Sequence, residues 1–335
     1  MPDSLPDAES LVRRLSARGA RRGHDAHSPV SMPWRGWWDI LRRVTGQIEA
    51  DRVPLVAAGV TYYLLLSLVP ALTALVSVYG LFSDPSAVQQ QLTLLRPFLP
   101  ADALAILEAE LLRLATQADA TLGVAASLAI GIALWSANSG MKAVIQALNI
   151  AYGETEKRGY LRLTLISLVF TLGTVVLAIT LIALLVAIPL LAQALGLGEQ
   201  AGTVSRLGGA VLLAAGTVFG LAAIYRWGPS RVAARFRWIT PGAGIAVLIC
   251  VLASLAFSWY VASFQSFNKT YGSLGAIIML MTWVWILITV VIMGAEFNAE
   301  TERQTLRDST KGPDRPIGQR GAVVADDIAP VHRGG

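Results

Sequence analysis

The chain has 335 residues, of which 54% are hydrophobic and only 15% charged, whereas soluble domains usually carry about 25% charged residues. Its 27 Lys and Arg residues exceed its 22 Asp and Glu residues, for a net charge of +5. The shortage of charge excludes an ordinary water-soluble domain, and the single cysteine, Cys250, excludes an internal disulfide.

Six stretches of the sequence lack Asp, Glu, Lys and Arg over a length that can cross a bilayer. A helix needs about 20 apolar residues to cross a hydrocarbon core, and lipid-buried backbone favours helices for segments this apolar. The sequence therefore predicts an all-α polytopic membrane protein, with a six-transmembrane-helix bundle over residues 53–300. The predicted spans are about 53–81, 122–141, 163–195, 207–225, 240–262 and 273–297.

Two segments precede the first span. Residues 1–30 are polar and rich in arginine, which indicates a disordered arm. Over residues 31–52, apolar side chains recur at spacings of three and four, with charged side chains on the other face. This pattern predicts an amphipathic helix at the membrane–water boundary, or one packed against the end of the bundle. The apolar positions are Trp34, Trp37, Trp38, Leu41, Val44 and Ile48.

The connections between spans carry further signals. Residues 82–121 have leucines at helical spacing, which predicts an external helical hairpin. Pro189 predicts a kink near the end of the long third span, and Thr240 followed by Pro241 predicts the start of the fifth span. Residues 301–335 are polar and rich in Gly and Pro, which indicates a disordered tail.

The basic residues fix an orientation for these spans. The two ends of the chain and the second and fourth connections hold 23 of the 27 Lys and Arg residues. Because cytoplasmic segments collect Lys and Arg, both termini are expected in the cytoplasm. Membrane orientation accounts for the basic balance, so nucleic acid is not an expected partner.

The predicted spans contain none of the residue combinations that commonly carry catalysis. The three histidines, His24, His27 and His332, all lie in the predicted disordered ends. The sequence has no phosphate-binding Gly-rich loop and no nucleophile elbow, and its carboxylates are scattered over loops. We therefore expect no enzyme activity, no metal site and no cofactor.

Several polar side chains lie at membrane depth on the predicted cytoplasmic side. Such groups usually face the bundle interior or a wet cavity, which predicts a cytoplasm-facing polar cavity. The alternative is that they only join neighbouring helices or reach back to the interface. The cavity candidates are Tyr62, Tyr63, Asn138, Lys142, Arg226 and Glu296. On the opposite side, Asn268 and Tyr271 are candidates for an external gate, or else form a tight turn.

The sequence resembles the YihY/BrkB family of bacterial inner-membrane proteins, formerly labelled ribonuclease BN, over roughly residues 35–302. The matching stretches include AAGVTYY (57–63), residues 135–153, RGYLR (158–162), YRWGP (225–229), WITPG (238–242), NKTYGSLGA (268–276) and GAEFNAE (294–300). The resemblance implies six helices in the inner membrane, cytoplasmic ends, and a role in transport or lipid handling. The residues themselves give the ribonuclease label no support.

Two functions remain in competition at this level. The first is a transporter or lipid-handling protein of the inner membrane, with membrane lipids as partners and a small molecule or a lipid as substrate. The second is a non-transporting membrane scaffold of an envelope complex. The sequence leaves the substrate, the coupling ion and the oligomeric state open.

Overall fold

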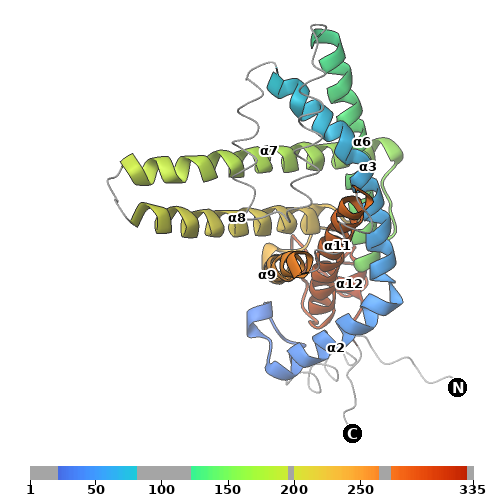
Figure 1. The fold of residues 1–335 in the computed structure, drawn as a ribbon. Helices are drawn as coiled ribbons and strands as arrows, with labels where there is room; N and C mark the ends of the chain where they lie inside the picture. Colours follow the sequence, from blue (N-terminus) through green and yellow to red (C-terminus); the bar gives the residue numbers. More distant parts are fainter. Residues whose placement is uncertain (1–21, 81–121, 195–199, 264–272, 330–335) are drawn as a thin grey trace, which may run out of the picture.

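A computed structural model describes residues 22–80, 122–194, 200–263 and 273–329, and the described chain is helical almost throughout (Figure 1). The 3₁₀-helix η2 (Pro29–Ser31) and α2 (Trp34–Ala50) come first, and the single turn α12 (Val323–Asp326) comes last. Between them lie six long helices: α3 (Val53–Gly80), α6 (Leu122–Ala151), α7 (Tyr160–Ala194), α8 (Gln200–Trp227), α9 (Phe236–Ser263) and α11 (Ser273–Arg303).

Each long helix coincides with one predicted span, which confirms an all-helical membrane protein. Within the described residues, four helices are long and apolar enough to cross a bilayer, and α3 adds a shorter apolar stretch, Val53–Leu68. The four segments are Tyr160–Leu185, Ser205–Trp227, Phe236–Val261 and Gly275–Arg303. The predicted external hairpin, 82–121, lies outside the described residues.

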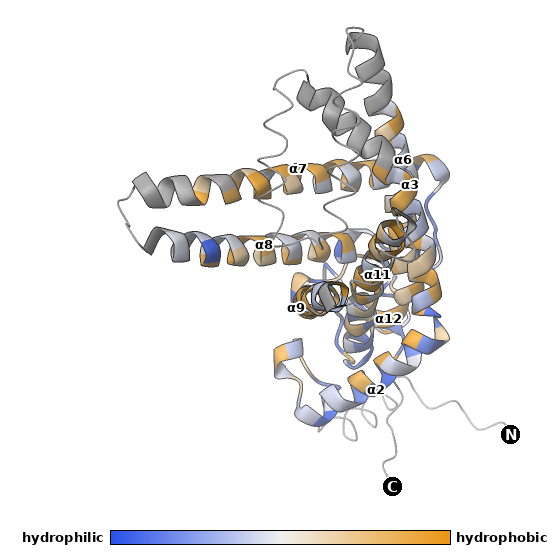
Figure 2. Ribbon diagram, in the orientation of Figure 1, coloured by the Kyte–Doolittle hydropathy of each residue, from blue (hydrophilic) through white to orange (hydrophobic). Residues whose placement is uncertain are grey.

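The long helices pack as three pairs, α3 with α6, α7 with α8, and α9 with α11. The pairs meet at one end, near α2 and α12, and leave it in different directions (Figure 1). We call this shared end the base. In the most apolar 18-residue window of each of these four segments, only 6% to 22% of the residues are buried, so the orange faces in Figure 2 have little protein against them. The helices thus converge at the base and diverge beyond it.

Small residues let the helices of two pairs approach closely. Leucine side chains of α7 lie over glycines of α8, where a Cβ would crowd them: Leu185 over Gly209, Leu181 over Gly216 and Leu177 over Gly220. Such contacts are a common way for helices to pack in lipid, where apolar burial gives no net advantage.

The α9–α11 crossing is closer still. A Cβ on Gly242 would overlap the Gly294 carbonyl oxygen and the Asn298 side chain. The Asn298 Oδ1 atom accepts a hydrogen bond of 2.9 Å from the Gly242 amide. Helix α9 begins at Phe236 and contains Pro241, so the predicted start at Thr240 is one turn late. The Gly242 amide, next to Pro241, is hydrogen-bonded to Asn298 of α11. The sequence around Pro241 does not indicate this partner.

The predicted disorder at the two ends is wrong for the described parts, residues 22–30 and 301–329. His24 is only 2% exposed, and its carbonyl accepts a 2.8 Å hydrogen bond from the Leu306 amide. The Thr305 hydroxyl donates to the Ala26 carbonyl, and Arg320, 4% exposed, donates to the carbonyls of Leu306 and Ala325. The polar groups of these two segments form hydrogen bonds with each other and within the tail, so their polar composition does not indicate disorder here.

Helix α2 combines the two arrangements that its sequence allows. Ile40 and Val44 are buried, and Trp37 stacks on Phe297 of α11 with ring centroids 5.6 Å apart. Trp34 and Trp38 are instead 75% and 60% exposed. One face therefore packs on the base, and the other presents indole rings suited to a membrane interface.

Substituting Gly242 tests the α9–α11 crossing. We expect Gly242→Ala to lower the free energy of unfolding by about 1–3 kcal/mol, because the new methyl group forces apart two backbones already in contact. Gly59→Ala in α3 is the matched control, since a Cβ there meets open space. The melting temperatures of both variants are measured by thermal unfolding in detergent. Equal melting temperatures would contradict the close backbone contact between α9 and α11 at Gly242.

Candidate functional site

The base is held together by a cluster of buried ion pairs, which we call the ion-pair cluster: Arg43, Arg231, Glu300, Glu302 and Arg303. Its first half joins α2 to α11. The Glu300 carboxylate is 1% exposed and receives the Arg43 Nε and the Arg303 guanidinium, each at 2.6 Å. Arg43 also donates to the Gln304 side chain at 2.6 Å.

The second half of the cluster joins the α8–α9 connection to α11. The side chains of Arg231 and Glu302 are both 0% exposed and meet at 2.7 Å. The other Glu302 oxygen accepts a hydrogen bond from the Ser309 hydroxyl, and the Arg231 guanidinium lies 4.4 Å from the centre of the Tyr152 ring. The residues around this pair come from three distant parts of the chain: the end of α6, the α8–α9 connection, and α11 with the residues that follow it.

The α6–α7 connection supplies a second polar network beside the cluster. The Glu156 carboxylate accepts hydrogen bonds from the Arg158 guanidinium and from the Asn149 amide. The Arg158 hydrogen bonds lower the pKa of Glu156 to about 2, with a smaller opposing effect of burial. The Asn149 Oδ1 in turn accepts from the Ser230 amide, which ties α6 to the α8–α9 connection. This network is structural, because each group in it has a partner.

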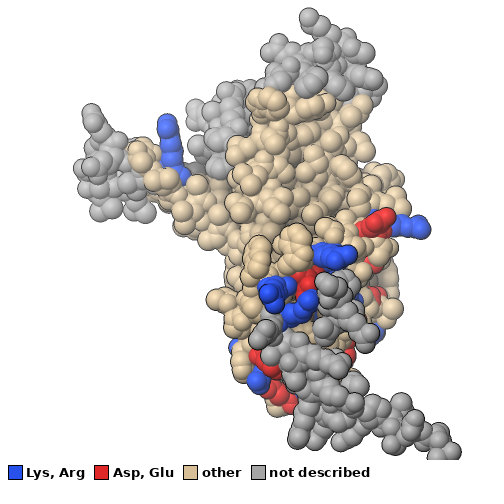
Figure 3. Space-filling model, turned by 90° about the horizontal axis from the view of Figure 1, so that it is seen from below, with Lys and Arg blue, Asp and Glu red and all other residues tan. Residues whose placement is uncertain are grey.

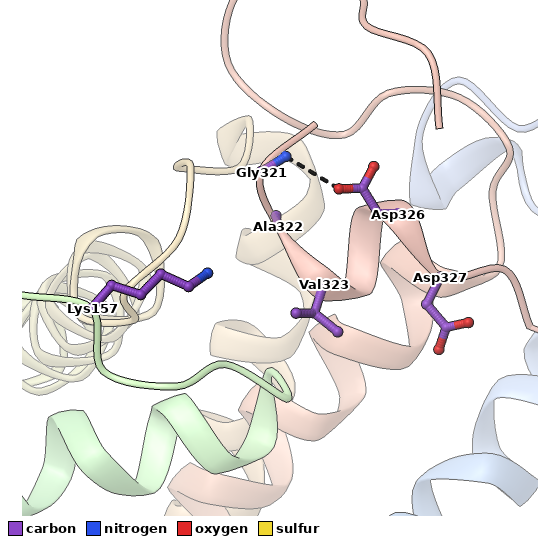
Figure 4. Close-up of a pocket in the computed structure, with 6 residues that line it drawn as sticks. All are labelled: Lys157, Gly321, Ala322, Val323, Asp326 and Asp327. Atoms are coloured by element: carbon purple, nitrogen blue, oxygen red, sulfur yellow. Dashed lines mark hydrogen bonds between the residues drawn. The ribbon is translucent and has the colours of Figure 1, made fainter. Parts of the chain in front are cut away.

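The hollows at the base are shallow. One of about 390 Å³ lies between the Lys157 side chain and the α12 segment (Figure 4). Its far wall carries Asp326 and Asp327, and the Asp326 carboxylate is occupied by the Gly321 amide at 3.2 Å. A second hollow, of about 320 Å³, lies between α2 and the ion-pair cluster. In the view from below, acidic side chains lie next to basic ones in several places (Figure 3).

The predicted cavity residues are not brought together around one cavity. Tyr62 and Tyr63 are 56% and 47% exposed and pack edge to face on each other, on the outside of α3. Asn138 is buried between α6 and α7, where its Oδ1 accepts a hydrogen bond from the Ser167 hydroxyl. Asn138 thus joins two helices, which is the alternative that the sequence left open.

The two predicted basic residues lie over aromatic rings near the base. The Lys142 ammonium is 4.4 Å from the centre of the Tyr160 ring. The Arg226 guanidinium is 4.1 Å from the Phe236 ring and 5.3 Å from the Trp227 ring. Neither forms an ion pair with a carboxylate in the described part of the chain.

Glu296 is the predicted residue with the most unusual surroundings. It is 0% exposed, and neither carboxyl oxygen accepts a hydrogen bond from the residues that the structure describes. Asp51, in the turn between α2 and α3, lies within hydrogen-bonding reach of it. The gate candidates Asn268 and Tyr271 lie outside the described residues.

Sequence reasoning missed most of the ion-pair cluster. Glu302 and Arg303 stand in a stretch that reads as a disordered tail, and Arg231 counts only as a loop charge. One signal was available, since Glu296 and Glu300 are four residues apart and share a face of α11. The partner of Glu300 on α2, Arg43, lies 257 residues away, and no local pattern indicates that distance.

A converging set of long apolar helices above a buried ion-pair cluster defines this chain as a polytopic helical membrane protein. The chain belongs to the BrkB family, because residues 44–317 match the family described as Virulence factor BrkB. The family resemblance noted in the sequence is therefore confirmed.

Curated relatives cover most of the chain. A protein of Bacillus subtilis named as ribonuclease-like, YfkH, is 29% identical over 72% of this chain and 88% of its own length. A UPF0761 membrane protein of Vibrio atlanticus is 29% identical over 78% of this chain and 82% of its own length. A third, from Chromobacterium violaceum, is 26% identical over 78% of this chain and 62% of its own length. No solved structure matches the chain.

Removing one partner of the fully buried pair tests the ion-pair cluster. We expect Glu302→Gln to lower the free energy of unfolding by about 3–5 kcal/mol, because Arg231 then stays buried without a counter-charge. Asp314→Asn is the matched control, since Asp314 pairs with Arg235 at the same distance, 2.7 Å, but is 74% exposed. Breaking an exposed pair costs about 0–1 kcal/mol. Chemical denaturation in detergent measures the free energy of unfolding of both variants. Equal decreases in the two variants would contradict the prediction that the buried pair contributes more to stability than the exposed one.

Proposed function

We propose that this protein is a lipid-handling transporter of the bacterial inner membrane, with six spans and with the base in the cytoplasm. The observation that carries the proposal is a set of basic side chains without ion-pair partners in the described chain, at the base ends of apolar helix pairs that have little protein around them. We call these residues the basic belt: Lys142, Arg162, Arg226 and Arg237.

The orientation rests on the charge distribution. The base carries the arginine-rich α2, the basic belt and the folded tail, and the cytoplasmic side of a membrane protein collects such residues. Tyr160, Trp227 and Phe236 lie beside the belt and are 65%, 49% and 43% exposed. Aromatic side chains gather where hydrocarbon meets headgroups, so these rings suit the inner boundary of the bilayer.

A lipid phosphate supplies the counter-charge that the belt lacks. Arg226 is only 7% exposed, and its Nε makes no hydrogen bond with a described residue. A planar guanidinium with a buried, unbonded N–H group gains from a charged acceptor such as a phosphate group, whose oxygens can accept two of its hydrogen bonds. The uncovered faces of α7 and α8 would then hold acyl chains, for which their leucines and valines are suited.

Cysteine labelling tests the orientation. With Cys250 replaced by serine, a cysteine at Asp314 in the tail is expected to react with a membrane-impermeant maleimide only after the cells are permeabilised. A cysteine at Arg206, exposed at the opposite end of α8, should react in spheroplasts and serves as the control. Reaction of Asp314→Cys in intact spheroplasts would place the base outside and remove the proposal's first step.

Reconstitution tests the lipid step. Proteoliposomes with a fluorescent anionic phospholipid should show protein-dependent movement between leaflets, read by quenching from outside. We expect the double variant Lys142→Gln, Arg226→Gln to slow movement roughly tenfold or more, since a hydrogen bond to a charged group contributes about 1.5–3 kcal/mol. Arg307→Gln, an exposed tail variant, should move lipid like the wild type.

The same assay separates the competing functions. A wild-type protein that moves neither anionic nor zwitterionic phospholipid would contradict lipid movement and favour the scaffold. The double variant matching the wild type would keep lipid movement but remove the basic belt from it. RNA added to the purified protein, with and without divalent metal, should remain intact under our proposal.

A further inference from the structure

The Glu296 carboxyl lies in the interior of the base without a group that can neutralise it. Its side chain is 0% exposed, and no described donor reaches either oxygen. Its polar neighbour within hydrogen-bonding reach is another acid, Asp51, at the junction of α2 and α3. Because an ionised carboxyl group only accepts hydrogen bonds, two of them can bond each other only when one holds a proton.

The charged groups around this pair are engaged elsewhere. On α11, the Glu300 carboxylate forms ion pairs of 2.6 Å with Arg303 and with Arg43 of α2. Tyr152, just after the end of α6, interacts electrostatically with Glu296, but its ring is covered by Arg231, which is paired with Glu302. Glu296 therefore faces Asp51, Glu300 and Arg303 with no cation of its own. Ionising it would add a second negative charge beside Asp51 in a dry place, which is strongly unfavourable.

We propose that Glu296 and Asp51 form a proton-binding site, in which one proton shared by the two carboxyl groups holds the α2–α3 turn against the base end of α11. The site takes a proton rather than a metal ion because no three His, Cys, Asp or Glu side chains come together in the described chain as metal ligands.

Loss of the proton would loosen a defined contact. Helix α3 begins just after Asp51 and is held to α11 by the Trp285 indole, which donates to the Pro54 carbonyl at 2.8 Å. Two carboxylates facing each other at this turn repel, so deprotonation favours movement of the start of α3 away from α11. The site is independent of lipid handling, since it needs only the buried pair and the turn.

Infrared spectroscopy detects the proton directly. We expect the wild-type protein in detergent at neutral pH to show the carbonyl stretch of a buried protonated carboxylic acid. The band should be absent in Glu296→Gln and absent or shifted in Asp51→Asn. Glu49→Gln, an exposed acid on α2 next to the turn, is the matched control and should keep the band. A wild-type spectrum without the band at neutral pH overturns the proposal.

Stability against pH gives a second readout. The folded state holds a proton that an unfolded glutamate releases above about pH 4, so stability falls as the pH rises until the site itself ionises. In the wild type, this proton raises the equilibrium constant for unfolding by up to about tenfold for each pH unit. The variant Glu296→Gln mimics the neutral acid, so this part of the pH dependence should be missing from it. If Glu296→Gln has the same pH dependence of stability as the wild type, the proposal is overturned. It is also overturned if sodium at fixed pH stabilises the wild type but not the variant.

These readouts separate the site from the proposed function. If the infrared band is present and phospholipid does not move, the proton site stands and lipid handling fails. If phospholipid moves and the band is absent, lipid handling stands and the proton site fails.

Discussion

The structure depends on the ion pairs that its helices bury at the end where they meet. Apolar helices gain little from each other when lipid surrounds them, so polar contacts and close packing must supply their cohesion. Here the ion-pair cluster supplies it, because Glu300 and Glu302 on α11 bind arginines from α2 and from the α8–α9 connection. Helix α11 is thus the element to which the others are joined.

This arrangement divides the molecule into a cohesive base and diverging helix pairs. Within each pair, small residues such as Gly216 and Gly242 allow close contact. Between pairs, apolar faces stay uncovered, and lipid or another polypeptide must cover them. Under the proposed function, acyl chains would lie against these uncovered faces.

The sequence predicted the elements well and the site poorly, for one physical reason. Hydropathy is local, so uncharged stretches place all six long helices, as in α3, which begins at the predicted residue 53. Pairing is not local: Arg43 and Glu300 are 257 residues apart. The polar composition of the two ends likewise indicates disorder unless their partners are known, as the buried His24 and Arg320 demonstrate.

Glu296 differs from the other buried glutamates of α11, Glu300 and Glu302, because it has no arginine partner among the described residues. A turn away on the same helix, Glu300 has two arginines, whereas Glu296 has another acid. A carboxyl kept only for stability at this position would be better replaced by an apolar side chain of similar size, since burying an unpaired charge costs free energy. Its position at the junction of α2, α3 and α11, where the α2–α3 turn meets the base end of α11, instead suits a group whose charge changes.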